Sequence, residues 1–160
     1  MATMFLLTAI PGSGKSTWAA RYQNNHDNVT VVSSDGIRQS YFGSVQNFDH
    51  EKEVWEIFLR KLHEGAAIEN GTTIADATNL TNAFRLYYLK ETPEYDKHIL
   101  VIFEVPFERC LIQNRMRPAD RVVSESAMEM LHRQYEPLSK EVIDAYDEVW
   151  RIGPDFERIN

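Results

Sequence analysis

The sequence reads, close to its start, Ala9-Ile10-Pro11-Gly12-Ser13-Gly14-Lys15-Ser16-Thr17. This stretch follows the pattern G-x-x-x-x-G-K-[ST], with Ala9 at the position where the first glycine usually stands. The apolar run of residues 4–9 favours a buried strand, and Trp18 and Tyr22 recur behind the glycines at helical spacing. A strand, a glycine-rich turn and a helix in this order are typical of a phosphate-binding loop.

The residues of this loop suit the phosphates of ATP. Two glycines let the backbone turn so that several N–H groups converge on phosphate oxygens, and the helix that follows adds its positive end. Lys15 is expected to reach the β- and γ-phosphates, the Ser16 hydroxyl to ligate Mg²⁺, and Thr17 to support them. The residues predicted to bind ATP are therefore Pro11, Gly12, Ser13, Gly14, Lys15, Ser16 and Thr17.

Strands and helices alternate along the rest of the chain. Further strands are expected at residues 29–32, 72–75, 98–105 and 148–152. Helices are expected from Gly36, over residues 49–70, from Thr81 to about residue 91, from about Phe107, and over residues 124–135. This alternation predicts an α/β fold with a parallel sheet of five strands between two layers of helices, in one domain of residues 1–160.

A carboxylate, Asp35, follows the second expected strand, at the sheet edge where ligands of such folds bind. There it can accept the proton of an attacking hydroxyl as a general base. If a helix begins at Gly36, Arg38 lies one turn further on and shares a face with Asp35. The alternative interpretation is that Asp35 only caps this helix and that Arg38 pairs with it.

A second carboxylate, Asp76, follows the third expected strand in the same way. Its place is that of a Walker-B acid, which holds Mg²⁺ directly or through water, so Ser16 and Asp76 are the predicted metal-binding residues. Thr78 and Asn79 come next and are predicted to orient the substrate or Asp35. The alternative is an Asx turn that caps the next helix.

An arginine-rich loop, residues 115–123, connects two of the expected helices. It carries Arg115, Arg117 and Arg121, and Pro118 prevents a continuous helix. Such a loop suits a lid that closes over ATP and neutralises charge during phosphoryl transfer, where one arginine is worth about 10³-fold or more in rate. The alternative is a solvated connector.

The composition sets limits on the function. The chain has 160 residues, a hydrophobic fraction of 43% and a charged fraction of 26%, as expected for a folded domain rather than a disordered chain. Its single cysteine, Cys110, excludes an internal disulfide, favours a reducing, cytoplasmic setting and argues against a disulfide-linked partner. No apolar run approaches the ~20 residues of a membrane span, so no membrane partner is expected.

The formal net charge of -7 argues at first against a polyanionic partner. The charge is unevenly distributed, however, because residues 1–40 and 109–133 are locally positive on an acidic chain. Arginines outnumber lysines, and their planar fork matches phosphate oxygens. This distribution fits ATP and a small acceptor or strand end better than a long duplex. A protein that binds a long duplex is expected to carry a broad basic stripe on its surface.

The stretches Pro11–Ala19 and Ser34–Ser40 together resemble the kinase domain of phage polynucleotide 5′-kinases, and Asp76–Leu80 resembles its bacterial members. Residues 115–123 and the helix after them are also similar to that family, so the resemblance covers nearly the whole chain. It implies a P-loop NTPase of the nucleoside-kinase-like type, a three-layer sandwich with an Arg-rich lid at about residues 115–123. Ala77, between Asp76 and Thr78, departs from the phage form.

The resemblance also implies roles for individual residues. Asp35 would be the general base on a 5′-hydroxyl, and Arg38 would bind the phosphate beside the acceptor nucleotide. Lys15 and one of Arg115, Arg117 and Arg121 would stabilise the transferring phosphoryl group. The adenine would lie near the loop after Ile152. The predicted substrate-binding residues are Arg38, Asp76, Thr78 and Asn79.

Two alternative functions stay open. Small kinases of nucleosides, metabolites or antibiotics share the same loop and lid, so these two features do not select the acceptor. A nucleotide-binding switch without acceptor chemistry is the third possibility, although a switch needs no base such as Asp35. Tyr87, Tyr88 and Trp150 are interpreted as core residues rather than as platforms for stacking bases.

Overall fold

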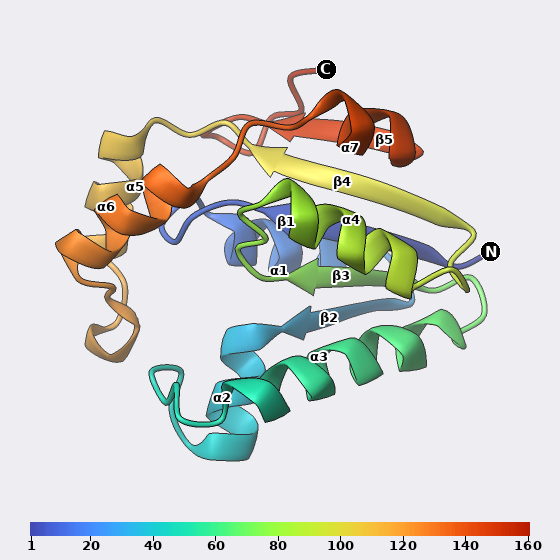
Figure 1. Cartoon of the computed structure of the whole chain (residues 1–160), viewed down its shortest axis with the longest axis horizontal. Coiled ribbons are helices and arrows are strands. Elements are labelled where there is room, and N and C mark those ends of the chain that lie inside the picture. The colour runs from blue at the N-terminus through green and yellow to red at the C-terminus, as the bar shows by residue number, and fades with distance from the viewer.

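The computed structural model describes residues 1–160 and contains one five-stranded sheet. The strands are β1 (Thr3–Thr8), β2 (Val29–Ser33), β3 (Thr72–Asp76), β4 (Lys97–Phe103) and β5 (Glu148–Ile152). Their order is β2-β3-β1-β4-β5, and all neighbours pair in parallel. All carboxyl ends therefore meet at one edge, on the left in Figure 1. This confirms the predicted α/β fold.

Seven α-helices surround the sheet. They are α1 (Lys15–Asn25), α2 (Ser34–Phe42), α3 (Glu51–Ala66), α4 (Asn82–Glu91), α5 (Phe107–Arg115), α6 (Glu125–Gln134) and α7 (Lys140–Ala145), with a short 3-10 helix, η1 (Ala119–Arg121). In Figure 1, α3 and α4 cover the near face of the sheet and α1 lies behind it, whereas α5 and α6 stand beyond the carboxyl ends of the strands. None of these helices is both long and apolar enough to cross a membrane.

Strand β1 shows why the sheet is buried on both sides. Successive side chains of a strand point to opposite faces. Met4 and Leu6 accordingly join the core beneath α3, whereas Phe5 and Leu7 pack with Trp18 of α1 on the other face. A strand buried on both faces reads as a continuous apolar run, which is the pattern from which β1 was predicted.

The structure differs from the predicted elements in several places. Helix α7 was not predicted, because Val142 is its only buried residue and so short a helix has no clear apolar period. Helix α3 spans fewer residues than the predicted 49–70, and α2 begins at Ser34 rather than at Gly36. Tyr88 is buried as expected, but Tyr87 is 42% exposed and so is not a core residue.

Candidate active site

The phosphate-binding loop has the geometry that its glycines require. Gly12 and Gly14 have φ angles of +83° and +91°, a region that side chains other than glycine rarely adopt. A Cβ atom on Gly12 would lie 2.2 Å from the carbonyl oxygen of Cys110, so α5 packs directly against the loop. Ala9 is buried and donates its N–H to the carbonyl of Thr78 at 3.0 Å. It directly follows β1, and this bond ties it to the segment after β3.

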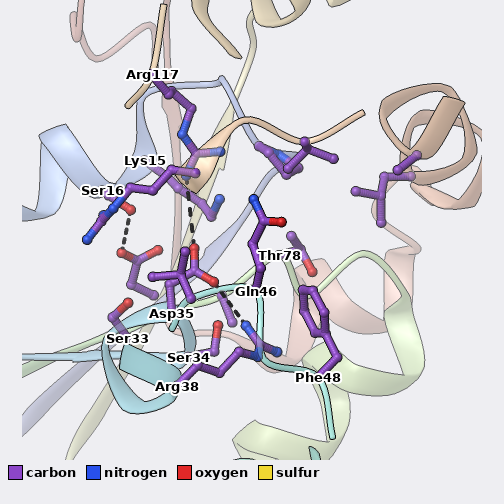
Figure 2. A pocket seen from close by; sticks show the side chains of 18 of the residues that line it. Lys15, Ser16, Ser33, Ser34, Asp35, Arg38, Gln46, Phe48, Thr78 and Arg117 are labelled. Carbon is purple, nitrogen blue, oxygen red and sulfur yellow. Dashed lines mark hydrogen bonds and ion pairs between the residues drawn. The ribbon is translucent and has the colours of Figure 1, made fainter. Parts of the chain in front are cut away.

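A lysine, a serine and an aspartate lie together under this loop. The Ser16 hydroxyl donates a hydrogen bond of 2.7 Å to Oδ2 of Asp76, drawn as a dashed line in Figure 2. Burial lowers the pKa of Lys15, although the carboxylates of Asp76 and Asp35 oppose this effect. Burial likewise raises the pKa of Asp76, against the opposing influence of Lys15 and Ser16. Burying the charges of Lys15 and Asp76 thus costs free energy, and the attraction between the two groups offsets part of that cost.

Arg38 is held between two carboxylates and two aromatic rings. It donates to Oδ1 of Asp35 at 3.0 Å, and to Glu51 through Nε and Nη2 at 3.0 and 2.6 Å. Its guanidinium lies 4.9 Å from the ring centre of Phe48 and 5.7 Å from that of Trp55. Burial works against its charge, but the bonds to Glu51 and Asp35 outweigh this and raise the pKa of Arg38. No motif in the sequence indicates that Glu51, in the first turn of α3, contacts Arg38.

The helix that carries Asp35 and Arg38 is capped by a different residue. The Ser33 hydroxyl accepts a hydrogen bond from the N–H of Gly36, so Ser33 and not Asp35 is the N-cap of α2. Asp35 therefore lies in the first turn with a side chain that is 43% exposed. It pairs with Arg38, as the alternative interpretation had it, while its second oxygen faces Arg117 (Figure 2).

The three arginines of the predicted loop have different surroundings. Arg115 is the last residue of α5 and so lies in a helix, whereas Arg117 and Arg121 follow that helix. Arg117 points toward Lys15 and Asp35 in Figure 2, and its Nη2 lies 4.0 Å from Oδ2 of Asp35. Arg121 also lines the cavity described below, whereas Arg115 pairs with Glu125 at 3.5 Å and has a side chain that is 60% exposed. Of the three arginines, the structure brings Arg117 closest to the predicted base.

A cavity of about 620 Å³ joins these groups. Lys15, Asp35 and Arg38 are among the polar residues that line it, and apolar side chains including Trp55 and Leu131 line it as well. A smaller hollow of about 160 Å³ lies over the residues of the phosphate-binding loop, and Arg117 and Lys15 line both spaces. Arg117 and Lys15 therefore stand between a space suited to phosphates and a space suited to an acceptor.

The segment after β3 divides between the site and the core. Thr78 is half-buried and lines the 620 Å³ cavity. Asn79 does not line it, because its side chain is buried and its amide donates to the carbonyl of Leu7 at 2.8 Å. The capping alternative is also not seen, since Thr81 caps α4 by accepting from the N–H of Phe84.

Arg85, on α4, has a structural role that the sequence motifs did not indicate. It is fully buried, and its guanidinium donates to Thr8 Oγ1, to Asn82 Oδ1 and to the carbonyl oxygens of residues 79, 80 and 136. These bonds join the segment after β3, which carries Thr78, to the end of β1.

A family model described as an AAA domain matches residues 4–138. The chain belongs to this AAA domain family. No curated protein matches the sequence of this AAA domain.

Solved structures match the fold of this AAA domain. A chain of the Pnkp1/Rnl/Hen1 RNA repair complex has 23% identity and a TM-score of 0.70 over 99% of this chain and 48% of that one. A fungal RNA kinase has 19% identity and a TM-score of 0.63 over 94% and 74% of the two chains. A gluconokinase from Sinorhizobium meliloti 1021 has 13% identity and a TM-score of 0.60 over 94% and 82%. The AAA domain thus spans about half the length of the RNA repair chain, and its fold is that of P-loop kinases.

Proposed function

We propose that this AAA domain is an ATP-dependent kinase that phosphorylates the 5′-hydroxyl end of a polynucleotide. The observation that carries the proposal is the position of Asp35, whose carboxylate lines the same cavity as Lys15 and lies 4.0 Å from Arg117. A base, a phosphate-binding loop and an arginine around one space are the parts that phosphoryl transfer needs. A nucleotide switch would have no use for the base.

In the proposed reaction, the acceptor oxygen attacks the γ-phosphorus of ATP and a new O–P bond forms. The bond from the γ-phosphorus to the β–γ bridging oxygen breaks, and ADP leaves. Asp35 takes the proton of the hydroxyl, and the pair with Arg38 keeps its carboxylate oriented. Lys15 and Arg117 neutralise the charge on the phosphoryl oxygens, while the loop amides hold the phosphates.

The donor set fits a magnesium ion. Ser16 and Asp76 offer a hydroxyl and a carboxylate oxygen 2.7 Å apart, and hard oxygen ligands of this kind suit Mg²⁺, which takes its other ligands from phosphates and water. When bound, the ion would supply positive charge that draws phosphate oxygens together. Ser16 and Asp76 are the residues that would hold it.

The lining of the acceptor cavity supports a nucleotide over a polyol. Phe48, Trp55, Met130 and Leu131 contribute apolar surface, which suits the flat face of a base better than a chain of hydroxyl groups. The likenesses to an RNA repair chain and to an RNA kinase agree with this choice. The buried, lone Cys110 is in keeping with the cytoplasmic setting that we propose.

The test offers γ-labelled ATP and Mg²⁺ with 5′-hydroxyl RNA, 5′-hydroxyl DNA and a panel of small alcohols that includes gluconate. We expect label on a polynucleotide end, and Lys15→Ala should lower both ATP binding and transfer. Label on small alcohols alone would refute the polynucleotide acceptor, and ATP binding without any transfer would favour the switch.

A further inference from the structure

A second cavity, of about 900 Å³, opens beside the acceptor cavity. Trp55, Thr78 and Leu131 line both spaces, so the two adjoin each other. We call the second space the distal groove; α3, α4, α6 and the segment after β3 contribute residues to its walls. None of the roles proposed above requires this space.

The distal groove presents flat aromatic surface on one helix. Phe84 and Tyr87 lie three residues apart on α4, a spacing that puts them on one face of the helix. They are 54% and 42% exposed, although both are large and hydrophobic. Aromatic side chains that are exposed along a groove commonly mark a binding site.

One basic and one acidic side chain line the groove. Arg133, exposed on α6, lines the groove and provides a positive charge. Glu136 is an acidic side chain in the lining, and its Oε1 already accepts a hydrogen bond of 2.8 Å from the N–H of Asn82. Stacking rings together with a basic group are the combination with which proteins hold single-stranded nucleic acids.

We propose that the distal groove binds the second and third nucleotides of a single-stranded acceptor, with bases stacked on Phe84 and Tyr87. This inference rests on the proposed function, because it concerns the same acceptor. The acceptor cavity of about 620 Å³ already lies within the size of a complete small-ligand site, so a small alcohol would leave the groove unused. A strand that enters the acceptor cavity by its 5′ end has to continue somewhere, and the shared residues lead into the groove.

The first experiment uses the wild-type protein and varies the acceptor. KM is measured for a nucleoside 3′-monophosphate and for 5′-hydroxyl oligonucleotides of two, three and six nucleotides. We expect KM to fall as the second and third nucleotides are added and to change little beyond them. Abasic sites at the second or third position should raise KM again, by about 5-fold to 100-fold for each stacked base.

The second experiment removes the rings. Phe84→Ala and Tyr87→Ala should raise KM for the trinucleotide relative to KM for the nucleoside 3′-monophosphate. On the abasic trinucleotide the same substitutions should have little further effect on KM. The missing base has already removed the stacking contact, so removing the aromatic ring costs nothing more. Ile112→Ala removes an equally exposed apolar side chain, 53% exposed on α5 and outside both cavities, and should leave the ratio unchanged.

The outcomes separate the two proposals. Equal KM values for the mononucleotide and the trinucleotide, with no effect of abasic sites, would overturn the groove assignment and leave the kinase proposal standing. Phosphorylation of a small alcohol but of no nucleotide would overturn the proposed acceptor. Should an alanine variant fail to fold, the length and abasic series on the wild-type protein still decides the question.

Discussion

Arg117 and Asp35 meet across the candidate active site, with Nη2 of Arg117 4.0 Å from Oδ2 of Asp35. One residue comes from the arginine-rich loop and the other from the first turn of α2, so the contact links two segments that are far apart in the chain. The pair places a cation of the loop beside the candidate base and above Lys15 (Figure 2). This relationship leads to the first two predictions.

Replacing Arg117 by alanine should lower kcat by about 10³-fold, because the charge of the transferring phosphoryl group loses a partner. Arg115→Ala is the matched control, since Arg115 is two residues away but faces Glu125 and lines neither cavity. It should change kcat little. Steady-state kinetics of both variants test this, and equal losses would contradict the assignment of Arg117.

Asp35→Asn should lower kcat by about 10²- to 10⁴-fold, because an amide cannot take the proton of the acceptor hydroxyl. ATP binding, measured by calorimetry, should stay close to that of the wild type. Asp27→Asn, at an exposed aspartate outside the cavities, serves as the control and should be fully active. A large loss of ATP binding in Asp35→Asn would point to a structural role instead.

Two glycines with positive φ provide a paired test of the phosphate-binding loop. Gly12→Ala should abolish ATP binding, because its Cβ would lie 2.2 Å from the carbonyl oxygen of Cys110. Gly43 has a similar φ of +85° but no atom near its added Cβ, so Gly43→Ala should cost only about 1 kcal/mol of stability. Urea unfolding and ATP titration of both variants distinguish a clash from backbone strain alone.

Arg85→Lys should destabilise the fold by about 3 kcal/mol, because a lysine cannot supply the planar set of donors and leaves buried oxygens unpaired. Arg60→Lys is the control, since Arg60 has a side chain that is 57% exposed and makes only two surface contacts, an ion pair with Glu64 of its own helix and a hydrogen bond of 3.4 Å to the Tyr41 hydroxyl. Its effect should stay within about 0.5 kcal/mol. Similar losses for both would show that the bonds of Arg85 are not needed for stability.

The pH dependence of stability should report on Asp76. Burial raises its pKa above the ordinary 3.8, so the folded protein keeps this proton to a higher pH than the unfolded chain does. Its stabilising contribution is present below pH 3.8 and is lost as the pH rises through the folded pKa. Asp76→Asn cannot titrate, and its free energy of unfolding relative to wild type should increase over this range. Urea titrations across acidic and neutral pH measure it, and a difference independent of pH would contradict the prediction.

Much of this architecture follows from local patterns. The run of residues 4–9, the glycines and Lys15 define strand, turn and helix over a short stretch, because each depends on spacing and on backbone freedom within a few residues. The same holds for β5, which the structure places at Glu148–Ile152 as predicted. Asp35 and Asp76 could be placed at one sheet edge for a similar reason, since the carboxyl ends of parallel strands always lie together.

The tertiary structure alone decided which side chains meet at that edge. The sequence does not distinguish the roles of Arg115, Arg117 and Arg121. Only the packing of this segment against the rest of the molecule separates Arg117 from Arg115. Glu51 reaches Arg38 because α3 packs on α2, a contact that no local spacing encodes. The direction of a side chain depends on neighbours distant in the sequence, whereas the class of a strand or helix depends largely on residues nearby.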